Sequence, residues 1–346
     1  MLKSQRLLLI IKLIKGVINM NIKKIGLTAL AGSLVATSAY AGSLSASGSA
    51  GITFSGNDTG TEGNSWSMSD GVTFTGSGEM DNGMTVSVTF EIDDANTNGG
   101  ALDDRLLKID TNGFGTITFG GHGASNAMGA VDDVTPTAYG EAFDILGTAN
   151  DMANAVTGTS IFNAIGSASS NNMFHYTSGD LVDGVKISAS YVPSDGTTEV
   201  ESSVDFAVEY TGVEGLTLGY AAGENNAEGG TNNTDNTTYY IKYAYGPVTV
   251  GYQESEQDSS AATNDDEFEA MGITYQVSDD LTIGYNESSY NDGNTTTDQE
   301  NSNISATYTM GSMTLSVAIA EEKNRGGDTN TSNDVKGYAV DLAFAF

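Results

Sequence analysis

Apolar and polar residues alternate one by one in segment after segment of this chain, and this pattern restricts its possible folds more than any other feature. In one such segment Met84, Val86 and Val88 lie on one side, whereas Thr85 and Ser87 lie on the other. Strict alternation is typical of a β-strand whose two faces meet different environments. We therefore predict sixteen strands, at residues 44–54, 66–80, 84–93, 103–111, 115–121, 171–177, 185–192, 202–211, 215–222, 236–245, 248–254, 267–277, 281–287, 302–310, 313–320 and 335–346.

The connections between these segments alternate in length. Short turns are expected at 81–83, 111–114, 178–184, 211–215, 246–247, 278–280 and 311–312. Long polar loops are expected between them, for example at 94–101, 223–235, 255–266, 288–301 and 321–334. With antiparallel strands this sorting puts both chain ends on the side of the short turns, as a transmembrane β-barrel requires. A soluble sandwich has no reason to sort its loops in this way.

A five-residue pattern also recurs every 32 or 33 residues, starting at Leu216, Val248, Leu281 and Met313. In the first three copies its second residue is Thr and it ends in Gly-Tyr, and each copy follows a short turn, so one repeat corresponds to one hairpin. Propellers and solenoids have similar periods. Those folds bury both faces of their strands, whereas one face here is consistently Thr, Ser, Glu, Lys or Asn.

The first 41 residues differ from the remainder because they hold six of the thirteen basic residues and no acid. From Met20 onward they show Lys23 and Lys24, an apolar stretch over 25–35, and small residues around Ala41. This arrangement predicts a secretory signal peptide over 1–41, cleaved before Gly42. Residues 1–19 are interpreted as an extended n-region, as an amphipathic helix or, in preference, as the product of a start codon assigned too early.

Charge and composition exclude several classes. After the signal peptide seven basic residues face 45 acids, which gives a net charge of −38. Nucleic acids and anionic membrane surfaces are therefore poor partners. The absence of cysteine excludes both disulfides and a lipid anchor on cysteine. No apolar run after Gly42 approaches the roughly 18 residues of a transmembrane helix.

Aromatic residues and the chain end favour a membrane barrel. Tyr residues lie near the short-turn ends of several strands, where an interfacial girdle belongs, at Tyr210, Tyr245, Tyr275 and Tyr308. The last ten residues, 337–346, place Tyr338 and Phe344 on one face and end on Phe346. Together with the signal peptide, the segment 113–120 before a very long third loop, and the segment 186–191 after it, this makes residues 42–346 resemble the general bacterial porins, especially their alphaproteobacterial branch.

The resemblance implies a fold and an assembly. The fold would be all-β, a transmembrane antiparallel barrel of sixteen strands with an infolded third loop. The protein would be a homotrimer in the outer membrane of a Gram-negative bacterium, surrounded by lipid and lipopolysaccharide. The barrel-assembly machinery would read the terminal residues Tyr338, Phe344 and Phe346. The chain departs from the family in having His175 where a wall arginine is usual and in lacking the Pro-Glu-Phe-like motif of the loop.

The candidate site is the third loop, 122–170, together with the barrel wall opposite it. A connection of this length is usually functional or disordered. Its acids would line the narrowest point of the pore: Asp132, Asp133, Glu141, Asp144 and Asp151. Apolar stretches at 142–146 and 161–165 would pin the loop to the wall. Alternation places Lys108, Lys186 and Lys242 in the lumen as a basic wall, with Glu91, Asp110, Asp205, Glu209 and His175 also facing it.

Blander interpretations of the same residues remain. The loop acids are equally consistent with a solvated surface, and the lysines with salt bridges to neighbouring lumen acids. The preferred hypothesis is passive, cation-preferring diffusion of small hydrophilic solutes and ions, without catalytic residues, metal or cofactor. Acid-rich loops such as 257–269 carry hard oxygen ligands for Ca²⁺, but they show no EF-hand spacing.

The sequence leaves three alternative functions. A secreted acidic adhesin or surface protein explains composition and export, but not the sorted loops or the terminal Phe346. A barrel hydrolase would need a base beside a nucleophile, and His122 and His175, the two histidines, stand near no nucleophile motif. A substrate-specific channel differs only in three-dimensional features of its lumen.

Overall fold

The computed structural model describes most of the chain after residue 41. The described residues are 42–58, 64–93, 102–131, 134–146, 171–179, 182–193, 202–225, 233–259, 265–291, 293, 297–331 and 334–346. Residues 45–346 form one compact unit. Among the described residues, no helix has the length and apolar character needed to cross a membrane.

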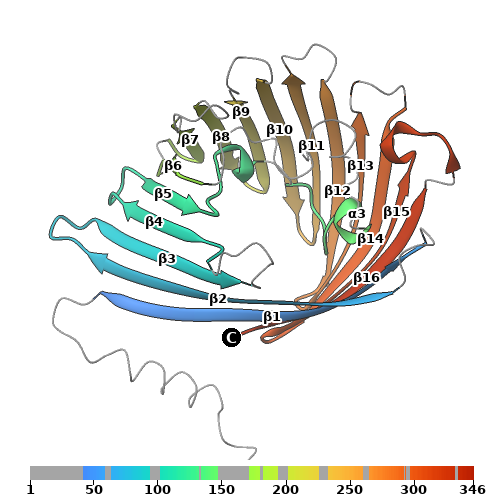
Figure 1. Cartoon of the computed structure of the whole chain (residues 1–346), viewed down its shortest axis with the longest axis horizontal. Helices are drawn as coiled ribbons and strands as arrows, with labels where there is room; N and C mark the ends of the chain where they lie inside the picture. The colour runs from blue at the N-terminus through green and yellow to red at the C-terminus, as the bar shows by residue number, and fades with distance from the viewer. Residues whose placement is uncertain are drawn as a thin grey trace, which may run out of the picture. The chain divides into compact units, whose positions relative to one another are not determined.

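The described residues form a closed barrel of sixteen antiparallel strands in which each strand pairs with its neighbours in sequence, and β16 pairs with β1 (Figure 1). The first eight strands are β1 (Ser43–Asn57), β2 (Ser65–Glu79), β3 (Thr85–Asp93), β4 (Arg105–Asp110), β5 (Thr116–His122), β6 (Met173–Thr177), β7 (Val185–Val192) and β8 (Ser203–Val213). The last eight are β9 (Leu216–Asn225), β10 (Thr234–Tyr245), β11 (Val248–Ser259), β12 (Asp266–Ser278), β13 (Leu281–Asn291), β14 (Gln299–Met310), β15 (Met313–Lys323) and β16 (Val335–Ala345). The predicted fold class and the number of strands are therefore confirmed.

Strand ends at the long-loop side are the main difference from the sequence prediction. β11 continues to Ser259 and β13 to Asn291, whereas the alternation ended at 254 and 287. β14 likewise begins three residues earlier, at Gln299. The predicted loops 255–266 and 288–301 were too long, because these extensions carry polar residues on both faces and the apolar alternation stops although the hydrogen-bonded ladder continues.

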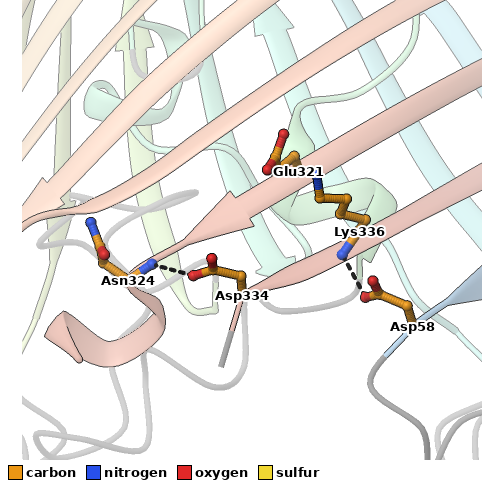
Figure 2. A network of polar contacts seen from close by, with 5 residues as sticks. All are labelled: Asp58, Glu321, Asn324, Asp334 and Lys336. Atoms are coloured by element: carbon orange, nitrogen blue, oxygen red, sulfur yellow. Dashed lines mark hydrogen bonds and ion pairs between the residues drawn. The ribbon is translucent and has the colours of Figure 1, made fainter. Parts of the chain in front are cut away.

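The seam between β1 and β16 closes the barrel at both of its ends. At the short-turn end the backbone N–H of Gly48 donates to the oxygen of Phe346 at 2.8 Å, and that of Phe346 donates to Gly48 at 2.9 Å. At the long-loop end the N–H of Lys336 donates to the Asp58 carboxylate at 2.7 Å (Figure 2). The Lys336 ammonium also lies 2.9 Å from Glu321 of β15, the strand on the other side of β16. Figure 2 also shows Asn324, whose backbone N–H donates to Asp334 at 3.1 Å beside this seam.

The two faces of the strands differ as the alternation predicts. In β10, Ile241 and Tyr243 are 47% and 42% exposed, whereas Thr238 and Tyr240 are 0% and 4% exposed. The first pair faces outward and the second faces the enclosed space. Large apolar side chains are exposed in this way on strand after strand, because the outward surface of such a barrel meets lipid rather than water.

Aromatic residues border this outer apolar surface. Tyr245 is 75% exposed at the short-turn end of β10, and Tyr275 and Tyr308 are exposed at the corresponding ends of β12 and β14. A second row lies nearer the long loops, where the hydroxyl groups of Tyr252 and Tyr285 donate to outward glutamates two residues further along the same strands. The tyrosines thus mark the boundary between apolar and polar surface on the outside of the barrel.

Candidate functional site

The third loop lies inside the barrel (Figure 1). It leaves β5 after His122 and returns at Met173 in β6, and its described parts are 123–131 and 134–146. They contain the short helices η1 (Met128–Ala130) and α3 (Ala142–Leu146). The loop therefore occupies the space that would otherwise be open lumen.

The first part of the loop is anchored on β6 to β10. The backbone N–H of Ala127 donates to the Ser190 hydroxyl at 2.6 Å, and Nδ1 of His175 lies 2.8 Å from the carbonyl oxygen of Ser125, which accepts its proton. Met128 and Val131 are completely buried in one cluster, whose inward wall residues include Ala207, Ala221 and Tyr240. This packing fixes the entry of the loop into the barrel.

The second part follows the wall across β11 to β14. The N–H of Val134 donates to the Gln253 side chain at 2.9 Å. The side chains of Thr307 and Asn303 donate to the carbonyl oxygens of Ala138 and Gly140 at 2.6 Å and 2.8 Å. Because the wall side chains satisfy backbone groups of the loop, the loop has one defined course rather than many.

The helix α3 ends the described part of the loop against β15 and β16. Ala142 and Leu146 pack into a buried cluster with Ala320 and Val335 of those strands. The apolar stretch 142–146 thus pins the loop to the inner wall, as its composition indicates. The second predicted stretch, 161–165, lies outside the described residues.

The position of the loop along β13 can be tested with an engineered disulfide. An ideal Cβ on Gly284 of β13 would lie 3.2 Å from the Cβ of Ala138 in the loop, near the separation of about 3.8 Å found in disulfides. Because the chain has no native cysteine, the double variant Ala138→Cys/Gly284→Cys is expected to form a single intramolecular disulfide. Non-reducing electrophoresis of the thiol-alkylated protein would measure it.

The matched control pairs Ala138→Cys with Gly76→Cys, because Gly76 lies on β2 with no atom within 4 Å of an added Cβ. This control should remain reduced. Equal oxidation of both pairs would contradict the course of the loop along β13.

The loop acids are not arranged as one row on the pore. The expectation for Glu141 is wrong: its side chain is only 3% exposed and accepts a hydrogen bond from the Thr135 hydroxyl within the loop. Asp144 is exposed, and its carboxylate accepts the N–H of Glu141 at 3.0 Å. The surrounding protein partly desolvates it and raises the pKa of Asp144 above its ordinary value. Asp132, Asp133 and Asp151 lie outside the described residues.

The three lysines lie on the inward face of their strands, near the short-turn end. Lys186 stands opposite Glu209 in the β7–β8 register, and Lys242 stands opposite Gly251 in the β10–β11 register. Within the described residues none of Lys108, Lys186 and Lys242 forms an ion pair, so the salt-bridge alternative finds no partner there. Lys242 lines an open hollow of about 560 Å³ together with residues 134–137 of the loop.

Three of the four predicted lumen acids face the lumen, and the fourth is buried. Glu209 accepts a hydrogen bond from the Tyr240 hydroxyl at 2.7 Å, and Glu91 and Asp110 face inward on β3 and β4 in register with Thr73 and Thr116. Asp205 also faces inward, but it is 0% exposed, where η1 covers β8. The expectation that Asp205 lines open lumen is therefore wrong. His175 likewise holds the loop rather than standing free in the pore.

Sequence reasoning missed the wall residues that hold the loop. Asn303, Ser305 and Thr307 alternate along β14, and Gln253 occupies the same inward face on β11. Each has a hydrogen bond to the loop backbone. Their polarity was visible in the alternation, but it looked like ordinary water-facing lumen surface, and nothing in one sequence distinguishes a hydroxyl that meets water from one that meets a loop.

A closed barrel of sixteen strands with an apolar exterior, a polar interior and a loop packed inside it defines the class of outer-membrane channel barrels. A family model described as Gram-negative porin matches residues 26–328. The chain belongs to that family, and it is an outer-membrane protein. Comparison with the curated proteins finds no significant sequence match.

Solved structures of two porins and of one other outer membrane protein have the same fold. The anion-selective porin of Comamonas acidovorans superposes with a TM-score of 0.68 at 14% identity, covering 88% of this chain and 99% of that one. The trimer form of OmpT from Vibrio cholerae gives 0.64 at 13%, covering 88% and 100%. A mutant of the Rh. blastica porin gives 0.62 at 16%, also covering 88% and 100%. At these identities the likeness concerns the fold alone.

Proposed function

We propose that this protein is a general diffusion porin, a passive path for small hydrophilic solutes and ions through a water-filled pore. One observation carries the proposal: the third loop is bonded to one side of the inner wall, so that it narrows the lumen. Width and charge at such a narrowing determine which solutes pass. A channel of this kind performs no chemistry, so catalytic residues, a metal and a cofactor are not expected, and acidic loops carry only a weak case for Ca²⁺.

The proposed setting follows the family. Residues 1–41 serve as a cleaved signal peptide, and residues 42–346 assemble as a homotrimer in lipid and lipopolysaccharide through the barrel-assembly machinery. The trimer form described for the Vibrio cholerae protein supports the oligomer. Neutral and cationic solutes are the expected cargo.

The direct test is single-channel recording on refolded, detergent-purified protein. Stepwise conductance in planar bilayers is expected. A mature chain that stays dissolved in plain buffer and leaves liposomes sealed would contradict the proposal and favour the adhesin alternative.

The pore is expected to prefer cations modestly, because acids outnumber bases so strongly in the mature chain. Replacing Lys108, Lys186 and Lys242 with Gln should increase the cation-to-anion permeability ratio, measured from reversal potentials in a salt gradient. The matched control is Lys336→Gln, because Lys336 lies beside Glu321 on the exposed, outward face of β16. A clear preference for anions would refute this part of the proposal. The porin of Comamonas acidovorans is described as anion-selective.

The same preference should depend on pH. Desolvation raises the pKa of Asp144, so this carboxylate loses its charge at a higher pH than an ordinary aspartate as the solution is acidified. Cation selectivity is therefore expected to fall with decreasing pH, and less so in Asp144→Asn.

A further inference from the structure

The wall has no side chain at three positions where residues 136–138 of the third loop pass over it. Gly251, Gly272 and Gly284 lie on the inward faces of β11, β12 and β13, and each is opposed by a residue of the loop. A Cβ added to Gly251 or Gly272 would meet Pro136, and one added to Gly284 would lie 2.8 Å from the backbone nitrogen of Ala138. All of these approaches are closer than 3.0 Å, a separation that real Cβ atoms essentially never show.

The contacts are with atoms that cannot rotate away. On Gly272 a Cβ would meet the backbone oxygen, carbon and nitrogen of Pro136, and on Gly251 it would meet the ring of the same proline. The backbone of these glycines has no left-handed φ angle, so alanine would be compatible with each strand itself. The constraint at these positions therefore comes from the loop and not from the conformation of the barrel.

These glycines also explain part of the five-residue repeat. Gly251 and Gly284 are the fourth residues of the second and third copies, and Gly272 stands opposite Gly251 in the β11–β12 register. In the first copy the equivalent Gly219 faces the ring of Tyr240 instead, and in the fourth copy the equivalent residue is Ser316. On β11 to β13 the inward positions that residues 136–138 cross are therefore glycines, whereas the equivalent position is filled by the Tyr240 ring in the first copy and by Ser316 in the fourth.

We propose that Gly251, Gly272 and Gly284 are positioning residues that set the depth at which the third loop lies against the wall, and thereby the width of the pore. This inference rests on the proposed channel function. The loop can lie flush only because the wall lacks Cβ atoms there. Any side chain at these points must push residues 136–138 toward the centre of the barrel. The strands themselves cannot move outward, because β11, β12 and β13 are hydrogen-bonded to one another.

The test compares single-channel conductance in alanine variants of the refolded full mature chain. Gly272→Ala is expected to lower conductance by roughly a third, because the narrowest width governs flow, and Gly272→Ala/Gly284→Ala should lower it further. Two controls place the same methyl group elsewhere. Gly76→Ala adds it on β2 in open space, and Gly71→Ala adds it on β2 near the flexible carboxylate of Glu91. Both controls should conduct like the wild type.

Heat-modifiable mobility in electrophoresis would verify that each variant has a folded barrel. Wild-type conductance tests the channel function, and the ratio of variant to wild type tests the positioning role, so the two can fail separately. A ratio near one for Gly272→Ala, or an equal decrease in the Gly76→Ala and Gly71→Ala controls, would overturn the inference. So would an increase in conductance, because it would mean that the loop leaves the wall instead of moving inward.

Discussion

Deletion of Phe346 alone is expected to reduce the yield of assembled barrel by roughly tenfold or more. The deletion removes both backbone hydrogen bonds between Phe346 and Gly48, which join the last residue to β1. Each of these bonds contributes about 1 kcal/mol. Together they form the last pair of hydrogen bonds in the β1–β16 seam that closes the barrel. The ring, 72% exposed on the outer surface and packed over Gly48, is lost as well. The fraction of heat-modifiable protein after folding into liposomes measures the effect.

Two variants distinguish the role of Phe346 in closing the seam from a general effect of losing an exposed aromatic ring. Phe346→Tyr keeps the backbone bonds and the ring, and it should assemble like the wild type. Phe114→Ala removes a ring of similar exposure, 77%, from the turn between β4 and β5, away from the seam, and it should also assemble. Unimpaired folding of the shortened chain in liposomes together with failure in cells would assign Phe346 to recognition by the assembly machinery instead of barrel closure.

The strands could be predicted from sequence because lipid and water impose opposite requirements on their two faces. Met84 to Ile92 and Leu281 to Tyr285 show this alternation, and the structure places strands at both. Where both faces meet polar surroundings the signal disappears. Residues 255–259 extend β11 with Ser255 and Gln257 inward and Glu256 outward, and no apolar periodicity marks them.

The candidate site was less accessible to sequence reasoning for a related reason. The inward face of a porin wall is polar whether it meets water or the third loop, so the pattern predicts that Asp205 lines open lumen, although it is completely buried on a strand that η1 contacts. Glu141 looked like a pore acid because an acidic residue on a long loop is usually solvated, but Thr135, six residues earlier, accommodates it inside the loop. The repeat glycines carried a signal that could have been read: glycine weakens a strand interior and often marks a close backbone approach.

Replacement of Leu146 by Asp is expected to destabilise the third loop without unfolding the barrel. Leu146 is 6% exposed and packs with Ala142 on Ala320 and Val335. Losing a buried leucine costs roughly 2–5 kcal/mol, and a carboxylate placed there without a partner adds to that cost. The β15–β16 ladder behind α3 does not depend on this side chain, so heat-modifiable mobility should be retained.

Release of α3 from the wall should appear as current noise, because the loop would then fluctuate in the pore. In Leu146→Asp we expect frequent transient closures in single-channel traces where the wild type is quiet. Leu146→Met, which preserves the apolar contact with nearly the same volume, should behave like the wild type. In Leu146→Asp combined with Ala138→Cys/Gly284→Cys, oxidation would hold the loop at β13 and should shorten the closures, and reduction should restore them. Quiet traces from Leu146→Asp would show that the hydrogen bonds from Gln253, Asn303 and Thr307 hold the loop without α3.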